Sequence, residues 1–342
     1  MHFRKGQFVI ALWVDDIIVR GLPSESEEFY ERFGKRFNIK EPNYLKPNSK
    51  LCFVGCDIGC EIREGREWHY IDQSEAINTF LEDIGAKQVG RVASPMPTTT
   101  LLTSNTTPLN EEETSKFRSI MGSLNYFAHT LRYDIAFATS RLSQYQAKPT
   151  KGAMAAVERV LGYLRCTSDF RLEGPRVNSN TLQYYSDSDH AGDRGVTLFS
   201  RTGSMILLNG VPIHWRSQLQ SSGGRELAVS SAVAEIYALY DTLKESRLYN
   251  WRCKELGMTD VMECIHIKVD NKQAKSFAES TCPNSRIRGT VDLRDGWVQD
   301  LKAKGSCSVE HISTVDNVAD ILTKCLRQAR HCKLVEMLSK KC

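Results

Sequence analysis

The strongest constraint in this chain is a set of four acidic residues in its C-terminal half, each inside its own short signature. They are Asp187 in YYSDSDH, Glu235 in SSAVAEIYALYD, Asp270 in IKVDNKQA and Asp320 in NVADILTK. The local patterns predict a strand, a helix, a strand and a helix, in that order. Four carboxylates from separate elements can meet only through the fold, and once crowded they repel one another unless they bind protons or a divalent cation. The set therefore predicts a metal site of the kind that two-metal phosphodiesterases use.

Each acid taken alone also has an explanation without function. Alternation along the first strand places Asp187 and Asp189 on one face, so either could supply the first carboxylate, and either could be a solvated acid at a strand end. A helical glutamate such as Glu235 is usually solvated. The end of a strand, where Asp270 lies, also serves to cap the next helix, and the helix dipole alone favours Asp320 in a first helical turn. Only the ordered set of four supports a metal site.

Length and composition set broad limits. At 342 residues the chain predicts two or three domains, each large enough for a hydrophobic core. Apolar residues make up 41% and charged residues 25%, as in ordinary soluble globular proteins. The net charge of +4 permits nucleic-acid binding without requiring it. The apolar run near the N-terminus is too short to span a bilayer and is followed at once by Asp15 and Asp16, so it predicts a buried strand and no membrane segment.

The eleven cysteines, an odd number, favour reduced thiols in an intracellular protein. Cys52, Cys56 and Cys60 recur at a spacing of four in LCFVGCDIGCEI, and alternation would place all three on one face of a single strand. Paired CxxC motifs, or histidines at metal-ligand spacing, are absent from this cluster. The pattern therefore predicts buried, reduced thiols and not a metal site.

The chain divides into segments of different pattern. The first reads as mixed strand and helix, with a strand pair interrupted by Asp15 and Asp16. A linker rich in Pro, Ser and Thr, residues 95–108, leads into a helical segment. The third segment reads βββαβα, then a further helix and a last β–α step, with a hairpin turn predicted at Asn209 and Gly210. We place the four segments at residues 1–97, 98–180, 181–325 and 326–342, the last a C-terminal helix or tail.

These motifs together resemble the C-terminal part of the Pol polyprotein of copia-type retrotransposons, over nearly the whole chain. YSDSDHAGD, SRTGSMILLNGVPIHWRSQLQ, SSAVAEIYALYDTLKE, VDNKQA and VADILTKCL resemble its ribonuclease H domain. FRSIMGSLNYFAHTLRYDIAFATSRLSQYQ resembles the helical connection after the polymerase, and LWVDDIIVRG resembles the polymerase active-site hairpin, usually YVDD. The resemblance implies a multidomain α/β and α+β fold: a partial polymerase palm in residues 1–97, a helical thumb or connection in 98–180, and a ribonuclease H-like mixed five-stranded sheet with flanking helices in 181–325.

The resemblance also implies an activity. Asp187, Glu235, Asp270 and Asp320 become catalytic ligands of two Mg²⁺ (or Mn²⁺) ions, with Asp189 as the competitor for the first place. The reaction implied is endonucleolytic cleavage of RNA in RNA–DNA hybrids, where the 2′-hydroxyl distinguishes RNA from DNA. The expected partners are the hybrid, template RNA and DNA, with upstream Pol segments or a second copy of the chain, and no membrane. The expected places are cytoplasmic virus-like particles and the nucleus.

The polymerase part carries an expectation of its own. Asp15 and Asp16 correspond to the paired catalytic aspartates that hold the polymerase metal ions, and Trp13 stands where tyrosine is usual. The fourteen residues before Asp15 contain no acid, so the third aspartate and the fingers are missing. We therefore expect no reverse transcriptase activity without an N-terminal segment.

Three departures from the family pattern qualify the ribonuclease H expectation. Val233 stands where an acid is common, Gly289 and Thr290 stand near the place of an expected histidine, and residues 313–318 contain no histidine. The alternative is a catalytically dead remnant that acts at most as a nucleic-acid-binding module. GxxxxGK[ST] and GxSxG motifs are absent, so nothing supports an NTPase or an α/β hydrolase.

Overall fold

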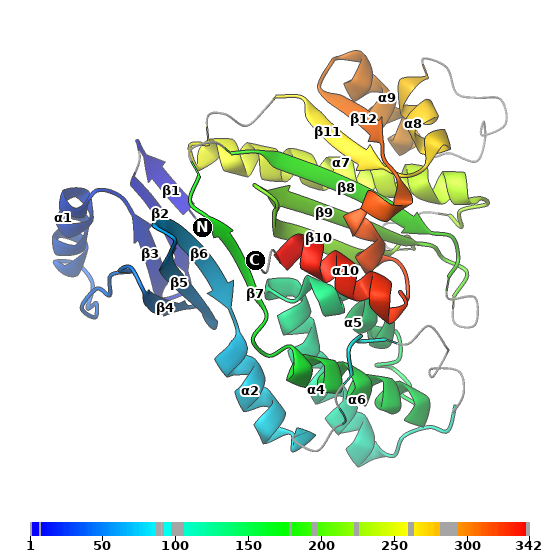
Figure 1. Ribbon diagram of the computed structural model, residues 1–342, viewed down its shortest axis with the longest axis horizontal. Coiled ribbons are helices and arrows are strands. Elements are labelled where there is room, and N and C mark those ends of the chain that lie inside the picture. Colours follow the sequence, from blue (N-terminus) through cyan, green and yellow to red (C-terminus); the bar gives the residue numbers. More distant parts are fainter. Residues whose placement is uncertain are drawn as a thin grey trace.

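A computed structural model describes most of the chain and arranges its strands in three sheets. Their strand orders are β1-β2-β3, β4-β5-β6-β7 and β10-β9-β8-β11-β12. Figure 1 shows the three sheets following one another across the molecule, with a group of helices below them. Within the described ranges, no helix is both long and apolar enough to cross a lipid bilayer. The described residues are 2–6, 8–86, 90, 92–96, 106–177, 180–192, 197–221, 226–258, 263–280 and 293–339.

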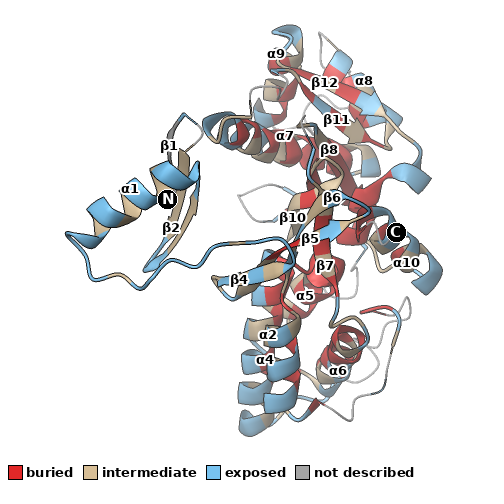
Figure 2. Cartoon of the chain, turned by 60° about the vertical axis from the view of Figure 1, so that its left-hand side comes forward, coloured by how far each residue is buried: buried red, intermediate tan, exposed pale blue. Residues whose placement is uncertain are grey.

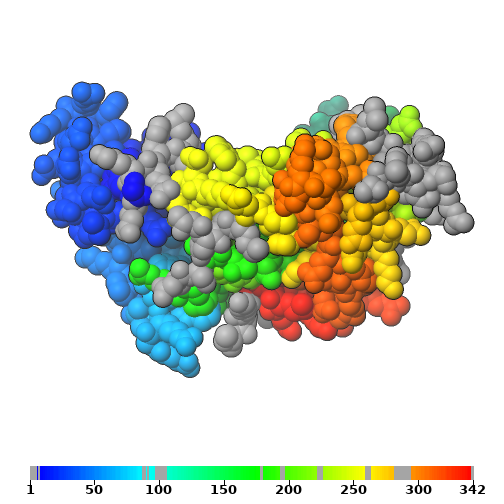
Figure 3. Space-filling view, turned by 90° about the horizontal axis from the view of Figure 1, so that it is seen from above, coloured from blue at the N-terminus to red at the C-terminus, as the bar shows by residue number. Residues whose placement is uncertain are grey.

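The first sheet forms an outlying unit. Its antiparallel strands are β1 (His2–Lys5), β2 (Phe8–Trp13) and β3 (Asp16–Arg20), followed by α1 (Pro23–Gly34). Helix α1 contains no buried residue, and its Phe29 ring lies 5.8 Å from that of Phe8. Figure 2 shows this unit standing away from the buried interior, and Figure 3 shows the N-terminal residues, in blue, at one end of the molecule. The predicted interruption of the strand pair is confirmed, but the β2–β3 turn lies at Val14 and Asp15, and Asp16 is the first residue of β3, paired with Trp13.

The second sheet corrects the interpretation of the cysteines. Residues 51–63 do not form one strand, because Val54 and Gly55, with φ of 52° and 70°, turn the chain between β4 (Ser49–Phe53) and β5 (Cys56–Arg63). Cys52 is therefore exposed on β4 while Cys60 is buried on β5. The predicted shared face is wrong, because residues paired across the turn share a face: Phe53 pairs with Cys56, so Cys52 lies on the other face from Cys56 and Cys60.

A strand that the sequence analysis placed in the helical segment completes this sheet. β7 (Arg171–Pro175) pairs antiparallel with β6 (Arg66–Asp72), about a hundred residues earlier in the chain. Glu173 on β7 accepts two hydrogen bonds from Arg63, at 3.0 and 2.8 Å. Such a bidentate pair fixes the register of the returning strand. The chain thus returns to this sheet after the helices.

The helices of this segment form as predicted. They are α4 (Glu111–Thr130), α5 (Ala136–Ser143) and α6 (Lys151–Cys166), and they pack with α2 (Ser74–Asp83) around a common apolar core. The Asn110 side chain begins α4 by accepting a hydrogen bond from the backbone N–H of Glu113, and the Glu113 carboxylate accepts one from the backbone N–H of Asn110. This capping box explains why the helix starts there.

The third sheet has the mixed five-stranded form that the resemblance implies. β8 (Leu182–Asp189) is central; it pairs antiparallel with β9 (Arg201–Leu208) and parallel with β11 (Ile265–Val269). β10 (Val211–Leu219) and β12 (Cys307–His311) are the outer strands. Asn209 and Gly210 form the predicted turn, both with positive φ. The helices that flank this sheet are α7 (Ser231–Glu255), α8 (Lys272–Glu279), α9 (Gly296–Ala303) and α10 (Gln328–Ser339).

The helical segment and the five-stranded sheet share a core. Leu131 and Tyr133 pack with Met205 and Leu207 of β9 and with Leu334 of α10. This burial joins regions that the sequence analysis assigned to different segments. Because neither side covers its apolar surface alone, the two regions stabilise each other.

A buried ion pair lies beside this shared core. Arg132 Nε and Nη2 lie 2.9 and 2.7 Å from the Asp134 carboxylate, and the Tyr163 hydroxyl donates to the same carboxylate at 2.7 Å. Both charged side chains are inaccessible to solvent. Burial alone would raise the pKa of Asp134, but Arg132 and Tyr163 together hold it below its usual range. The pair is therefore fully charged at neutral pH.

Asp134→Asn is expected to lower the free energy of unfolding by about 3–5 kcal/mol, because it leaves the Arg132 guanidinium buried without a counter-charge. The contribution of Asp134 is present at neutral pH and is lost as the pH falls below the unfolded value of about 3.9. Urea unfolding of the wild-type and Asp134→Asn proteins, at neutral and acidic pH, measures the difference in the free energy of unfolding. Glu28→Gln, which breaks the exposed Arg32–Glu28 pair, is the control and should change little. Equal effects of the two substitutions would contradict the prediction.

Candidate metal centre in the five-stranded sheet

Three of the four predicted acids meet at one edge of the five-stranded sheet. Asp187 lies near the end of β8, Asp270 directly follows β11, and Asp320 lies on the 3₁₀ helix η5 (Val318–Leu322). Each offers a carboxylate oxygen within 4.8 Å of the others. The parallel pairing of β8 with β11 explains part of this, because parallel strands end at the same edge of a sheet.

The fourth acid, Glu235, approaches the group from α7. Ser230 caps this helix by accepting a hydrogen bond from the backbone of Val233, so Glu235 lies in the second turn. Burial, and then repulsion from Asp187 and Asp270, raise the pKa of Glu235 well above its usual value. The backbone N–H of Ser188 donates to its carboxylate, yet Glu235 Oε2 is buried without a hydrogen-bond partner among the described residues. A buried, unpartnered carboxylate oxygen beside other acids is a position that a cation would satisfy.

Asp187 is fully buried, and burial is the main reason that its pKa is raised to about 7. Asp320 and Asp270 raise it further, whereas Lys324 and a hydrogen bond donated by Thr323 lower it. Crowded carboxylates with raised pKa values and an unpartnered oxygen suit a hard divalent cation that prefers oxygen ligands, such as Mg²⁺ or Mn²⁺. The residues present therefore fit the ions that the resemblance implies.

Two cationic side chains that the sequence analysis missed contact the acids. Lys324 Nζ lies 2.6 Å from Asp320 Oδ1 and 3.2 Å from Asp187 Oδ1, and Arg330 Nη2 lies 3.0 Å from Asp320 Oδ2. Burial opposes the charge of Lys324, but Asp187 and Asp320 outweigh it and raise its pKa. The sequence signal for Lys324 is its place four residues after Asp320, because residues four apart share a helix face. Arg330 has no such local signal.

A glycine allows Asp320 to approach Asp187. Gly203 on β9 lies directly opposite Asp187 on β8. A Cβ atom at this position would lie 2.6 Å from Thr323 Cγ2 and 3.0 Å from the carbonyl oxygen of Ala319. η5 therefore packs onto bare backbone, and this contact brings its acid to the sheet edge. The sequence analysis attached no role to Gly203.

The structure tests two alternatives from the sequence: Asp189 as the first metal ligand, and Asp270 as a helix cap. Asp189 accepts hydrogen bonds from the backbone N–H groups of Gly192, at 3.0 Å, and Arg201, so it organises the chain after β8. In the described part of the chain, the group of acids within reach of one ion includes Asp187 and not Asp189. Helix α8 is capped by Asn271, which accepts from two backbone N–H groups at 2.9 and 3.0 Å. Asp270 is therefore not needed as the cap.

The paired aspartates of the first segment lie elsewhere. Asp15 and Asp16 are exposed at the β2–β3 turn, in the outlying sheet. Neither belongs to the two groups of three or more potential metal ligands found within the described residues. Of the family departures, Val233 is buried, whereas Gly289 and Thr290 lie outside the described residues.

Comparison with known proteins gives the family. No protein-family model matches the chain. The chain is 30% identical over 327 residues to the retrovirus-related Pol polyprotein from transposon RE2 of Arabidopsis thaliana, covering 94% of this chain and 21% of that protein. It is 28% identical over 331 residues to the Pol polyprotein from transposon TNT 1-94 of Nicotiana tabacum, covering 94% and 24%. This chain belongs to the family of copia-type retrotransposon Pol polyproteins. It spans about a fifth of the length of these Pol relatives.

Solved structures show only distant likeness to this Pol chain. LC11 ribonuclease H1, isolated from compost, is 16% identical, with 48% of this chain and 98% of that one covered and a TM-score of 0.30. The foamy viral protease-reverse transcriptase is 11% identical, with 89% and 46% covered and a TM-score of 0.48. The assignment of the site therefore depends on the geometry of this chain.

Gly203→Ala is expected to push η5 away from β9, destabilise the protein by about 1–3 kcal/mol and weaken divalent-metal binding at the acids. Thermal unfolding with and without Mn²⁺ separates the two effects. Gly122→Ala in α4 is the matched control, because a Cβ there meets no atom within 4 Å. Unchanged Mn²⁺ binding in the Gly203 variant would show that η5 is not positioned by this contact.

The acids are expected to bind Mg²⁺ or Mn²⁺ with an affinity that depends on pH. Asp187, with a pKa of about 7, must lose its proton, so the apparent affinity should rise about tenfold per pH unit below that value and level off above it. Calorimetric titration with Mn²⁺ across this range measures the slope. Asp270→Asn should weaken binding, whereas Asp316→Asn, at an exposed acid in η4 (Thr314–Asp316), should not. A flat pH profile would contradict this role of Asp187.

Proposed function

We propose that the five-stranded domain is a ribonuclease H that cleaves the RNA strand of RNA–DNA hybrids with Mg²⁺ or Mn²⁺. The observation that carries the proposal is the meeting of Asp187, Asp270 and Asp320 at one sheet edge. Glu235 is near enough for Asp187 and Asp270 to raise its pKa, and its Oε2 is buried without a hydrogen-bond partner among the described residues. Membership in the copia-type Pol family supports it. In the first segment, Asp15 and Asp16 form an incomplete site of the RNA-directed DNA polymerase.

The residues divide the work between ion binding and charge balance. Asp187, Glu235, Asp270 and Asp320 would hold the ions, which supply an activated water and stabilise the leaving oxygen when bound. Asp270 is the half-buried member and marks the side from which a phosphodiester would approach. Lys324 and Arg330 offset part of the negative charge through their contacts with Asp320, and Lys324 also contacts Asp187. The positive charges of these two side chains lower the electrostatic cost of burying four carboxylates close together.

The proposed partners are nucleic acids. Among the distant structural neighbours, LC11 ribonuclease H1 was solved in complex with an RNA/DNA hybrid and the foamy viral protein in complex with double-stranded DNA. For this chain we propose binding to hybrid duplexes mainly through phosphates, because backbone contacts do not depend on sequence. The polymerase part is proposed to need upstream Pol segments, which the longer relatives have room to encode.

The contacts of Lys324 favour a second candidate function, one that needs no bound metal ion. Its ammonium group already bridges Asp187 and Asp320, so the acids have a counter-charge without any metal. A site balanced in this way would persist in a protein that no longer cleaves RNA. The alternative is therefore a folded, catalytically inactive nucleic-acid-binding module.

Cleavage of a labelled RNA–DNA hybrid in the presence of Mg²⁺ separates the two functions. The wild-type chain should cleave, and Asp187→Asn or Asp270→Asn should reduce the rate by at least about 100-fold, because the ions contribute several kcal/mol to transition-state stabilisation. Asp15→Asn, outside the acid group, is the control and should cleave normally. Binding of the hybrid without cleavage, at saturating Mg²⁺, would favour the inactive module.

A further inference from the structure

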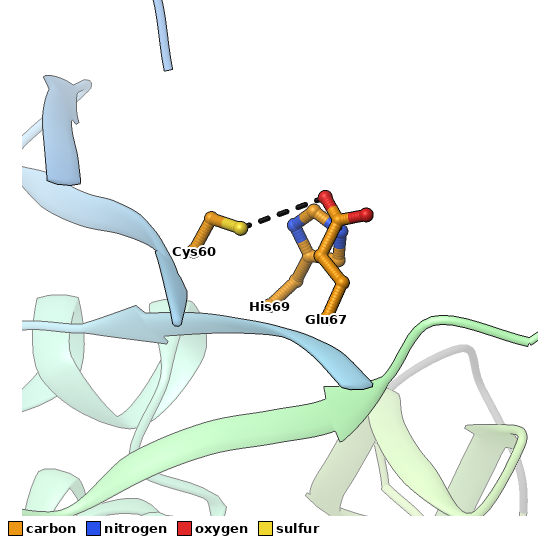
Figure 4. Close-up of side chains that lie close together, drawn as sticks. All are labelled: Cys60, Glu67 and His69. Atoms are coloured by element: carbon orange, nitrogen blue, oxygen red, sulfur yellow. Dashed lines mark hydrogen bonds and ion pairs between the residues drawn. The ribbon is translucent and has the colours of Figure 1, made fainter. Parts of the chain in front are cut away.

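A second group of potential metal ligands lies in the four-stranded sheet, away from the acids of the proposed nuclease. Cys60 on β5 is paired directly with His69 on β6, and Glu67 lies two residues before His69, so all three side chains leave the same face of the hairpin. Figure 4 shows them converging from the two strands. One atom from each side chain lies within 4.8 Å of the other two.

The two separations that involve Glu67 match those between ligands of a tetrahedral transition-metal site. Cys60 Sγ lies 3.5 Å from Glu67 Oε1, and the same oxygen lies 3.1 Å from His69 Nε2. Zinc bonds of about 2.3 Å to sulfur and about 2.0 Å to nitrogen and oxygen separate tetrahedral ligands by about 3.3–3.5 Å. Two of the three separations are therefore within a few tenths of an ångström of those in a zinc site, and the third, between Cys60 Sγ and a ring nitrogen of His69, is at most 4.8 Å.

The surroundings also suit a bound ion. The other oxygen of Glu67, Oε2, accepts a hydrogen bond from Arg176 at 2.8 Å, which orients Oε1 toward Cys60 and His69. The Cys60 thiol is buried, whereas nearly half of the His69 side chain is exposed. The site is thus closed on the sulfur side and open to solvent on the histidine side.

We propose that Cys60, Glu67 and His69 bind one divalent ion of the zinc class, with a water molecule as the fourth ligand. The thiol gives up its proton to solvent as the metal–sulfur bond forms, so that Cys–SH and M²⁺ become Cys–S–M and H⁺. The donor set of one sulfur, one nitrogen and one oxygen selects zinc-like ions over Mg²⁺. The bound ion would clamp β5 to β6 and, through Arg176, stabilise the strand β7 that returns to this sheet.

Rules based on the spacing of ligands in the sequence do not find this site. The sequence around Cys60 lacks CxxC pairs, and its ligands come from both strands of a hairpin, as C-x₆-E-x-H. Zinc motifs are recognised from ligands close together on a turn or helix. Here the register of the two strands, which places Cys60 opposite His69, brings the ligands together instead.

Titration of the full chain with Co²⁺ tests the proposal, because a thiolate bound to Co²⁺ gives a charge-transfer absorption band that carboxylates do not. Wild-type protein should show this band and tetrahedral visible bands at one equivalent, and Zn²⁺ should abolish both. The acids of the five-stranded sheet contain no sulfur, so Co²⁺ bound there does not interfere, and the result is independent of the proposed nuclease activity.

Cys60→Ser should remove the band and weaken Zn²⁺ binding by more than about 100-fold, because loss of an outer partner alone costs about 10- to 100-fold. Cys52→Ser, at the exposed cysteine on β4, is the matched control and should keep the band. His69→Gln, at an exposed position, tests the site without disturbing the interior, and it should lose the tetrahedral visible bands. A wild-type protein without the band, or a band lost in the Cys52 variant and kept in the Cys60 variant, would overturn the proposal.

Discussion

Burial of like charges at the end of β8 is the constraint on which the C-terminal half of this protein depends. Asp187 is inaccessible in the central strand, and Asp270, Asp320 and Glu235 all raise the cost of charging this corner of the sheet. A structure with this arrangement needs cations within reach, whether bound ions or side chains. Lys324, two residues after the 3₁₀ helix that carries Asp320, supplies one of these cations, so an acid and its counter-charge come from the same short stretch of chain.

The helical segment takes part in this balance although none of its residues is among the acids. Arg330 contacts Asp320, and the next residue of α10, His331, is hydrogen-bonded to the backbone carbonyl of Asp134 at 3.1 Å. Asp134 in turn holds the buried guanidinium of Arg132. Helix α10 therefore connects a buried ion pair of the helical segment to the acids of the sheet.

Local signals in the sequence predicted local structure. They did not predict which segments far apart in the sequence pair or pack together. The Asn209-Gly210 turn and the strand that precedes Asp270 each depend on neighbours in the sequence, and each forms as expected. The pairing of β7 with β6 joins residues about a hundred positions apart, and nothing in RLEGP alone distinguishes a strand from a loop. Gly203 was missed for the same reason, because its role appears only when η5 lies against it. The acids could be found because an ordered set of motifs carried them.

The two groups of ligands differ in a way that makes them chemically independent. The acids of the five-stranded sheet offer only oxygen atoms, which suit hard ions that keep part of their water. Cys60 adds a sulfur atom whose pKa is raised by burial and by Glu67, so only an ion that bonds strongly to thiolate can displace its proton. Mg²⁺ cannot do this, whereas zinc-class ions can. A change of Mg²⁺ concentration would therefore act at the sheet edge beside Asp187 and leave the hairpin of Cys60 and His69 unaffected.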